Sequence, residues 1–238
     1  MGWYRPVHCK AVPTQEVKAL LTARKLLVYK MRDVELAVRG LLRNFGLKVG
    51  PVSKGKFVGR VRELVGGQTV LETVIEPLLR VRETLRKEMN GLHKQLLTLV
   101  RTDAICRRLM TVPGVGAVTA MTFKAAVDDP ARFHSSKAVG AHLGLTPRKY
   151  QSGETDRTGA ITKAGDAMAR EALFEAATSL LCKVQRMSAL KAWGMRVAKR
   201  RGFKRAGVAV ARKLATVMHR MWVDETEFRW SREVAAAA

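Results

Sequence analysis

The sequence predicts a mainly α-helical protein, in which a coiled-coil hairpin of two long helices precedes a compact helical domain. Residues 14–45 and 68–101 repeat leucine or valine every seven positions, which is typical of long packed helices. Between residues 102 and 165 glycine and proline become frequent, which indicates short helices separated by turns. From residue 166 to 222 the apolar positions again recur at helical spacing, so the domain is expected to end in further helices.

The first long helix is expected over residues 14–45. Thr14 is a suitable N-cap, and Gly46, Gly50 and Pro51 end the helix. Its apolar residues form two adjacent rows of a coiled-coil seam. These rows contain Leu20, Leu27, Val34 and Leu41, and Met31, Val38 and Phe45.

The second long helix is expected over residues 68–101, after a basic connection, 52–67, that has room for one short helix. Its apolar seam contains Leu78, Leu85, Leu92 and Leu99, with Ile75, Met89 and Leu96 beside them. Two such seams predict either an antiparallel hairpin packed within its own domain or a surface for self-association into a homo-oligomer. A heptad seam does not identify its partner, so both interpretations stay open.

Three helices are expected in the carboxy-terminal part, over residues 166–187, 189–199 and 205–222. Gly202 separates the last two, and residues 226–238 form a tail. One face of the last helix is apolar and is expected to be buried. That face contains Val208, Ala211, Leu214, Met218 and Met221.

The net charge of the chain indicates a polyanionic partner. Its 238 residues include 44 lysines and arginines against 20 aspartates and glutamates, which gives a net charge of +24 at pH 7. Like charges repel in a compact fold, whereas each cation that contacts a phosphate releases a counterion. Ribosomal and membrane-surface proteins share this composition, so charge alone identifies the partner only as a polyanion.

The remaining composition argues against a metal site, a disulfide framework and a membrane anchor. Cys9, Cys106 and Cys182 are odd in number and far apart, and the five histidines show no metal-ligand spacing. Asp128 and Asp129 precede a proline and read as a turn. No apolar run approaches the roughly 18 residues of a membrane span, and no signal peptide is visible. A cytoplasmic, nucleoid-associated protein is therefore expected.

The sharpest local motif is the turn at residues 109–120, which contains Pro113, Gly114, Val115 and Gly116. The proline stops the incoming helix, and the two glycines are expected to allow positive φ and a close approach of phosphate to the backbone. The next helix would then offer free N–H groups and the positive end of its dipole. This pattern favours a helix-hairpin-helix-like, sequence-independent nucleic-acid contact over an ordinary helix turn.

A second motif combines glycines, hydroxyls and cations between residues 143 and 166. Ser152 precedes Gly153 in what reads as a flexible loop, where its hydroxyl is accessible. Four nearby cations are suited to hold a phosphodiester. They are Arg148, Lys149, Arg157 and Lys163. From the residues alone, a phosphate-binding loop without covalent chemistry is favoured, because serine next to glycine is common.

A third motif is a run of positive charge over residues 183–220, which contains no aspartate or glutamate. A solvated helix face usually mixes both signs, so this run indicates a surface that contacts phosphates. Its densest part contains Arg200, Arg201, Lys204 and Arg205.

Taken in order, these motifs resemble the insertion-sequence-110 family of transposases, which includes the Piv-type DNA invertases. The resemblance covers the family's transposase domain from about Arg107 to Trp222, and we place that domain at residues 102–225, after the coiled-coil region at 14–101. The motifs that carry it are Thr111 to Gly116, Leu143 to Pro147, Ser152 and Gly153, Gly159 to Gly165, and Arg170, Leu173, Ala176 and Ala177. Gly2 to His8, followed by the long helix with Leu21 to Arg24, resemble the end of the family's amino-terminal domain, and we assign residues 1–13 to a remnant of that domain.

The resemblance implies a chemistry that composition and spacing do not. In this family a RuvC-like amino-terminal domain holds four acidic metal ligands, which work with a serine of the transposase domain on DNA strands. The matching serine is Ser152, whereas the four acids have no counterpart in this sequence. The resemblance therefore implies no cofactor in this chain, Mg²⁺ in the complete family protein, and a structured guide RNA as a partner together with DNA.

The expected function is DNA strand transfer by an insertion-sequence transposase or recombinase, with Ser152 as nucleophile, in a truncated chain that is inactive alone. Two rivals remain. One is a non-catalytic, nucleic-acid-binding remnant, and the other is a helix-hairpin-helix DNA-binding protein of the repair type. The repair reading predicts no guide RNA and full tolerance of Ser152→Ala.

Overall fold

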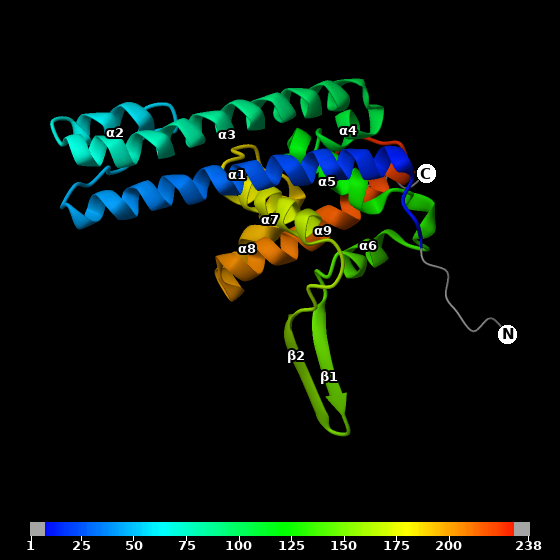
Figure 1. Cartoon of the computed structure of the whole chain (residues 1–238). Helices are drawn as coiled ribbons and strands as arrows, with labels where there is room; N and C mark the ends of the chain where they lie inside the picture. The colour runs from blue at the N-terminus through cyan, green and yellow to red at the C-terminus, as the bar shows by residue number, and fades with distance from the viewer. Residues whose placement is uncertain (1–7, 231–238) are drawn as a thin grey trace. The chain divides into compact units, whose positions relative to one another are not determined.

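The computed structural model describes residues 8–230 and is mainly helical, as the sequence predicts (Figure 1). The chain forms two compact units, one made of residues Ala19–Leu96 and the other of the residues up to Lys18 and from Leu97 onward. None of the described helices is long and apolar enough to cross a membrane. The elements are α1 (Val12–Asn44), α2 (Phe57–Val65), α3 (Thr69–Thr102), α4 (Ala104–Leu109), α5 (Ala117–Val127), η1 (Pro130–Arg132), α6 (Ser136–His142), β1 (Pro147–Ser152), β2 (Thr155–Ile161), α7 (Ala167–Cys182), α8 (Ala189–Arg201) and α9 (Phe203–Val223).

In the unit of residues 19–96, three helices surround one apolar core. The short helix expected between residues 52 and 67 is α2, which packs with parts of α1 and α3. Burial of such side chains supplies most of the stability of a small helical unit. The core includes Val38, Leu42, Phe57, Val61, Ile75 and Leu79.

A buried arginine joins the elements of this unit. The Arg82 side chain is fully buried, its Nε donates to Glu35 Oε1 at 2.7 Å, and its Nη2 donates to the Lys54 carbonyl at 2.8 Å. The guanidinium carbon lies 4.9 Å from the centre of the Phe57 ring. Since a buried charge is tolerated only when it is paired and hydrogen-bonded, these contacts fix the connection before α2 against α3.

The predicted coiled-coil rows are wrong in part. Both long helices are present, but Leu41, Phe45 and Leu99 are exposed, whereas Leu42 and Leu79 are fully buried. Within residues 19–96 the buried side chains lie on a different stripe of the long helices from the one predicted. The reason is that α2 forms a third side of the core, whereas a heptad pattern describes the contact of two helices only. Self-association through the long helices stays a prediction.

Helix α1 begins two residues earlier than expected, at Val12. Pro13 lies in the first turn of this helix, where a proline is tolerated because the N–H that it lacks would have no intrahelical partner. Thr14 lies inside the helix and hydrogen-bonds the Asp128 side chain. His8 Nε2 contacts the same carboxylate at 2.7 Å. Residues 1–7, which carry most of the resemblance to an amino-terminal domain, lie outside the described residues.

The other unit is built around α9, which packs against α4, α6, α7 and α8, while α5 packs against α4 and α7. The helices expected over 166–187, 189–199 and 205–222 are confirmed as α7, α8 and α9, although α7 ends at Cys182. In the predicted apolar face of α9 the residues Ala211, Leu214, Met218 and Met221 are buried, and Val208 is half-buried.

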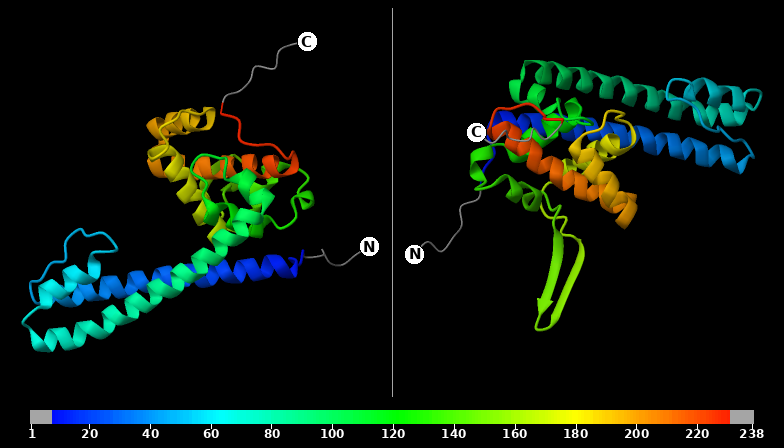
Figure 2. Two further views of the ribbon diagram at one scale, coloured as in Figure 1. Left: turned by 90° about the horizontal axis from the view of Figure 1, so that it is seen from above. Right: turned by 180° about the vertical axis from the view of Figure 1, so that it is seen from behind.

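The segment expected to be a flexible loop is a β-hairpin. Strands β1 and β2 pair antiparallel and extend away from the helices of their unit (Figures 1 and 2). All residues from 148 to 160 are exposed. Since neither face is buried, the strands have no apolar alternation, and for that reason the pattern of the sequence did not reveal them.

Candidate active site and nucleic-acid interface

The predicted nucleophile lies at the tip of the hairpin. Ser152 is the last residue of β1 and pairs with Thr155 across the two-residue turn formed by Gly153 and Glu154. Gly153 has φ +54°, a conformation that two-residue hairpin turns favour at their first position and that glycine adopts without strain. The turn therefore presents the exposed Ser152 side chain at the outer end of the ribbon.

Four side chains of chemical interest share one face of the hairpin. Tyr150 pairs with Arg157, and Ser152 lies two residues along the strand from Tyr150, so all three lie on the same face. A Cβ placed on Gly159 would lie 3.0 Å from Tyr150 Cε2 and 3.8 Å from Arg148 Cβ, which puts Arg148 on this face too. We call Arg148, Tyr150, Ser152 and Arg157 the serine face.

Within the serine face, Arg157 is the cation nearest Ser152. It is a diagonal cross-strand neighbour of Ser152, and such neighbours lie about 7–8 Å apart. Arg148 lies farther from the tip, and its Nη2 donates to the Thr162 carbonyl at 3.2 Å. Arg157 is therefore placed to contact a phosphate at Ser152, whereas Arg148 is placed nearer the base of the hairpin.

The opposite face of the hairpin carries balanced charge. Lys149 pairs across the strands with Thr158, and its Nζ lies 3.9 Å from Asp156 Oδ2. From the sequence, Lys149 is expected to contact phosphate in the same way as Arg148 and Arg157. Side chains along a strand point alternately to its two faces, so Lys149 points away from Ser152 and lies next to an acid.

The base of the hairpin is held by one arginine that the sequence did not single out for a role. Arg170 on α7 donates from Nη1 to the Leu143 carbonyl at 3.0 Å and to the Ala164 carbonyl at 2.9 Å. It thereby ties together the chain that enters the hairpin and the chain that leaves it. Every residue has a backbone carbonyl, so the sequence does not indicate this role of Arg170. Only its place in the family motif marks the residue.

Two glycines let these two chain segments cross in contact. Gly144 has φ +66°, and a Cβ there would lie 2.2 Å from the Ala164 carbonyl oxygen. Gly165 has φ +72°, and a Cβ there would lie 2.0 Å from the His142 carbonyl oxygen. Neither site can hold a larger residue without moving backbone, so the crossing sets the direction in which the hairpin leaves its unit.

Lys163, the fourth predicted phosphate contact, lies at this crossing and not on the serine face. Its φ is +57°, and its N–H donates to the Gly144 carbonyl at 3.1 Å, while its side chain is exposed.

The next polar residue, Asp166, caps α7 by accepting from the Met168 and Ala169 N–H groups. Burial opposes ionisation of Asp166, but hydrogen bonds from Lys18 and Ala169 outweigh it and lower the pKa of this carboxyl.

The turn between α4 and α5 corrects one expectation. Gly114 has φ +89°, as predicted, but Gly116 has φ −102°. A Cβ on Gly114 would lie 2.6 Å from the Ala176 carbonyl oxygen, so this glycine is required for packing against α7. Val115 is buried. Gly116 is exposed and open, and it is the N-cap of α5 without a side-chain cap, so it alone has the access to phosphate that was expected of both glycines.

The predicted basic cluster brackets the junction of α8 and α9. Arg200 and Arg201 end α8, Lys204 and Arg205 open α9, and all four are exposed. Gly202, at φ +83°, makes the turn between the two helices. Such concentrated cations favour a polyanion at this surface.

The metal expected in the complete family protein has no fitting donor set in the part of the chain that the structure describes. Within residues 8–230 no group of three or more histidine, cysteine, aspartate or glutamate side chains is arranged to hold a metal ion.

An exposed serine on a basic hairpin, in a mainly helical and strongly basic protein, fits the class of DNA-processing proteins, and the comparisons place the chain more narrowly. Residues 106–192, which include the hairpin, match the family model described as the transposase IS116/IS110/IS902 family. A probable family 20 transposase of Pseudomonas aeruginosa is 30% identical over 237 residues, covering 94% of this chain and 68% of that protein. The chain belongs to the IS116/IS110/IS902 transposase family.

Two further relatives extend this comparison. The transposase for insertion sequence element IS1111A of Coxiella burnetii is 29% identical over 231 residues, covering 94% of this chain and 63% of that protein. The pilin gene-inverting protein of Moraxella bovis is 30% identical over 113 residues, covering 47% of this chain and 34% of that protein. The chain thus spans only part of the length of each of these relatives.

Proposed function

We propose that this chain provides the nucleophile for DNA strand transfer, with Ser152 attacking a phosphodiester. The observation that carries the proposal is the serine face, on which an exposed hydroxyl at a hairpin tip shares its side with Arg148 and Arg157. Membership of a transposase family supports it, as does a relative whose name describes gene inversion.

The proposed step conserves the energy of the broken ester. The Ser152 Oγ bonds to phosphorus, one of the two deoxyribose P–O bonds breaks, and the leaving oxygen takes a proton while the serine proton passes to water. Attack by a hydroxyl of another strand then reverses the step on a new partner and releases the serine. Because a phosphodiester is replaced by a phosphodiester each time, the exchange needs no nucleotide cofactor.

Arg157 would stabilise charge on the phosphate during this attack. Its guanidinium can donate two parallel hydrogen bonds to phosphate oxygens, which Lys149 on the other face cannot match in geometry or position. Tyr150, which the sequence did not single out, is exposed between Arg148 and Ser152 and offers a flat ring beside the reacting strand. Its hydroxyl makes it the rival nucleophile on the same face.

A serine hydroxyl is a weak nucleophile until a base or a metal activates it. The family resemblance assigns that task to Mg²⁺ held by acids of a RuvC-like domain. We propose that this chain supplies the serine and the cations, and that it works together with such a domain and a structured guide RNA on DNA. The basic junction of α8 and α9 is then a surface for these polyanions.

The experiment that tests the proposal compares the two faces of the hairpin. In a strand-exchange reaction containing this chain, the family's acidic domain, magnesium and the element's RNA, we expect exchange by the unmodified chain. Arg157→Gln should slow it by about a hundredfold, since loss of one donor to developing charge typically costs that much. Lys149→Gln, which removes the same charge from the opposite face, should change the rate by less than about threefold. No exchange under any of these conditions, or equal effects of the two variants, would contradict the proposal.

The α4–α5 turn gives a separate prediction about binding, because the N-terminus of α5 is proposed to contact phosphate in the manner of a helix-hairpin-helix element. Gly116→Val should leave the fold intact and weaken binding to all DNA sequences alike, since backbone N–H groups carry no base information. Gly114→Ala should instead lower the stability of the fold by about 2–4 kcal/mol, through its positive φ and its clash with α7. Gel-shift titrations and thermal unfolding measure the two effects, and selective loss of one DNA sequence in Gly116→Val would count against this role.

A further inference from the structure

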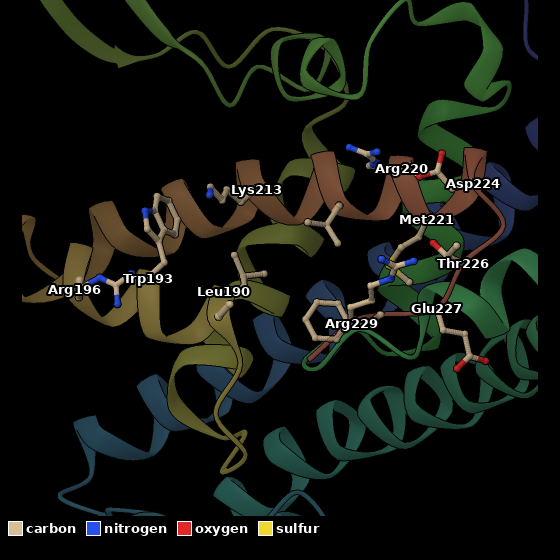
Figure 3. A pocket seen from close by; sticks show the side chains of 13 residues that line it. Leu190, Trp193, Arg196, Lys213, Arg220, Met221, Asp224, Thr226, Glu227 and Arg229 are labelled. Atoms are coloured by element: carbon tan, nitrogen blue, oxygen red, sulfur yellow. Dashed lines mark hydrogen bonds and ion pairs between the residues drawn. The ribbon is translucent and has the colours of Figure 1, made fainter. Parts of the chain in front are cut away.

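A groove outside the hairpin lies between α8, α9 and the segment that follows α9 (Figure 3). Its volume is about 580 Å³, within the roughly 300–1,000 Å³ range of small-molecule sites. Trp193 and Leu190 line it from α8, Lys213 and Met221 from α9, and Phe228 from the following segment. Figure 3 shows Trp193, Arg196 and Lys213 gathered at one end, with Asp224 and Glu227 toward the other.

The outer wall of the groove is fixed in place by contacts along the segment after α9. The Phe228 N–H donates to Thr111 Oγ1 at 3.0 Å, and the Ala189 N–H donates to the Trp230 carbonyl at 3.4 Å. The Arg186 guanidinium lies 4.4 Å from the centre of the Trp230 ring. These contacts hold the segment of residues 224–230 in place as the outer wall of the groove.

The two ends of the groove differ in charge. At the Trp193 end, Arg196 and Lys213 are exposed, and the Lys213 ammonium lies 4.6 Å from the centre of the indole ring. At the far end Asp224 is paired with Arg220 at 3.0 Å, so that the positive charge there is partly neutralised. An anionic group is therefore favoured at the Trp193 end.

We propose that this groove binds an unpaired nucleotide of single-stranded nucleic acid, with its base stacked on Trp193 and its phosphate held by Arg196 and Lys213. The inference goes beyond the proposed role of Ser152, which concerns a different part of the unit. When the base stacks, the flexible lysine moves from the ring to the phosphate and replaces a cation–π contact by an ion pair.

The combination of a ring and cations selects unpaired nucleotides over a duplex. In a double helix the faces of the bases are covered by their neighbours, so an aromatic side chain cannot stack on them without unstacking the helix. Exposed cations alone would bind duplex and single strands through their phosphates. The indole ring adds a contact that only an unpaired base can make, whether the strand is DNA or RNA.

The test measures binding of the full chain to short labelled oligothymidylate, oligouridylate and duplex DNA by fluorescence anisotropy. Trp193→Ala should weaken binding of both single strands by about tenfold or more, the usual contribution of one base–aromatic stack, and binding of the duplex by less than about twofold. Tyr29→Ala is the matched control, because Tyr29 is an exposed ring with Lys25 5.4 Å from its centre but lies outside this groove. Tyr29→Ala should bind all three probes normally.

A second variant keeps the test decisive if Trp193→Ala folds poorly by circular dichroism. Trp193→Phe retains a stacking ring, so it should bind single strands almost normally but lose the quenching of tryptophan fluorescence that the oligonucleotides cause in the unmodified chain. Quenching that persists in Trp193→Phe, or equal losses on duplex and single strands in Trp193→Ala, would overturn the proposal. A preference for oligouridylate or for oligothymidylate would support the site and identify the strand as RNA or DNA. The binding assay measures no strand exchange, so failure here is distinct from failure at the hairpin.

Discussion

Ser152→Ala should abolish strand exchange, with a rate at least about a thousandfold below that of the unmodified chain, because alanine has no group that can form the covalent bond to phosphorus. The fold should not change, since Ser152 is exposed at the hairpin tip and packs against nothing that its removal would expose. DNA and RNA binding should also persist, because the cations of the serine face and of the α8–α9 junction remain. Exchange is measured on labelled DNA, and binding by gel shift on the same preparation.

A matched control for this loss is the residue that pairs with Ser152 across the turn. Thr155→Val removes a hydroxyl from the same face and the same end of the hairpin. It should leave the exchange rate within about threefold, as expected of an exposed residue that takes no part in chemistry. Ser152→Ala with full activity would show that the serine assignment is wrong and would favour the repair-type interpretation.

Gly165→Ala should have the largest effect on stability. Alanine at φ +72° is strained, and its Cβ would lie 2.0 Å from the His142 carbonyl oxygen, so the backbone of the crossing must move. Together these costs amount to about 2–5 kcal/mol of unfolding free energy. Urea unfolding followed by circular dichroism measures the loss.

Gly153 provides the control for this prediction. Its φ of +54° is also positive, but no atom lies within 4 Å of an added Cβ. Gly153→Ala should therefore lose only the backbone term, about 1–2 kcal/mol. Equal losses at Gly153 and Gly165 would mean that conformation alone, and not the close approach of the two chain segments, determines the requirement for glycine at the crossing.

The helices could be predicted because their apolar residues recur with a period that only helices satisfy. The bounds predicted for two helices, residues 14–45 and 205–222, agree with those of α1 and α9 to within two residues at each end. The seam of the long helices was less predictable. Leu42 is buried and Leu41 exposed because a third helix, α2, completes the core of residues 19–96, and a pairwise heptad cannot anticipate that helix.

The hairpin could not be predicted. Apolar and polar residues alternate along a strand when one of its faces is buried, and this ribbon is exposed on both faces. For the same reason the sequence could not separate Arg157 from Lys149, since their faces are defined only by the register of the strands. Tyr150 escaped notice because its partners in the serine face come from both strands of the ribbon.

The glycines of the α4–α5 turn show that one motif can contain residues with different roles. Gly114 and Gly116 were assigned the same role, yet one is packed on α7 and the other faces solvent. Both are compatible with a turn, and only the neighbouring helix distinguishes them. The role of Ser152, in turn, came from resemblance to a family, because a serine next to a glycine carries no chemistry by itself.

The most direct test of the central claim is to find the covalent bond. The complete reaction, with the acidic domain, magnesium and guide RNA, is stopped with denaturant and digested with nuclease and trypsin, which cuts after Lys149 and after Arg157. Mass spectrometry of the resulting peptide, residues 150–157, should show a nucleotide phosphate on Ser152. A phosphate on Tyr150, or strand exchange that leaves no covalent protein–DNA intermediate at all, would contradict the account.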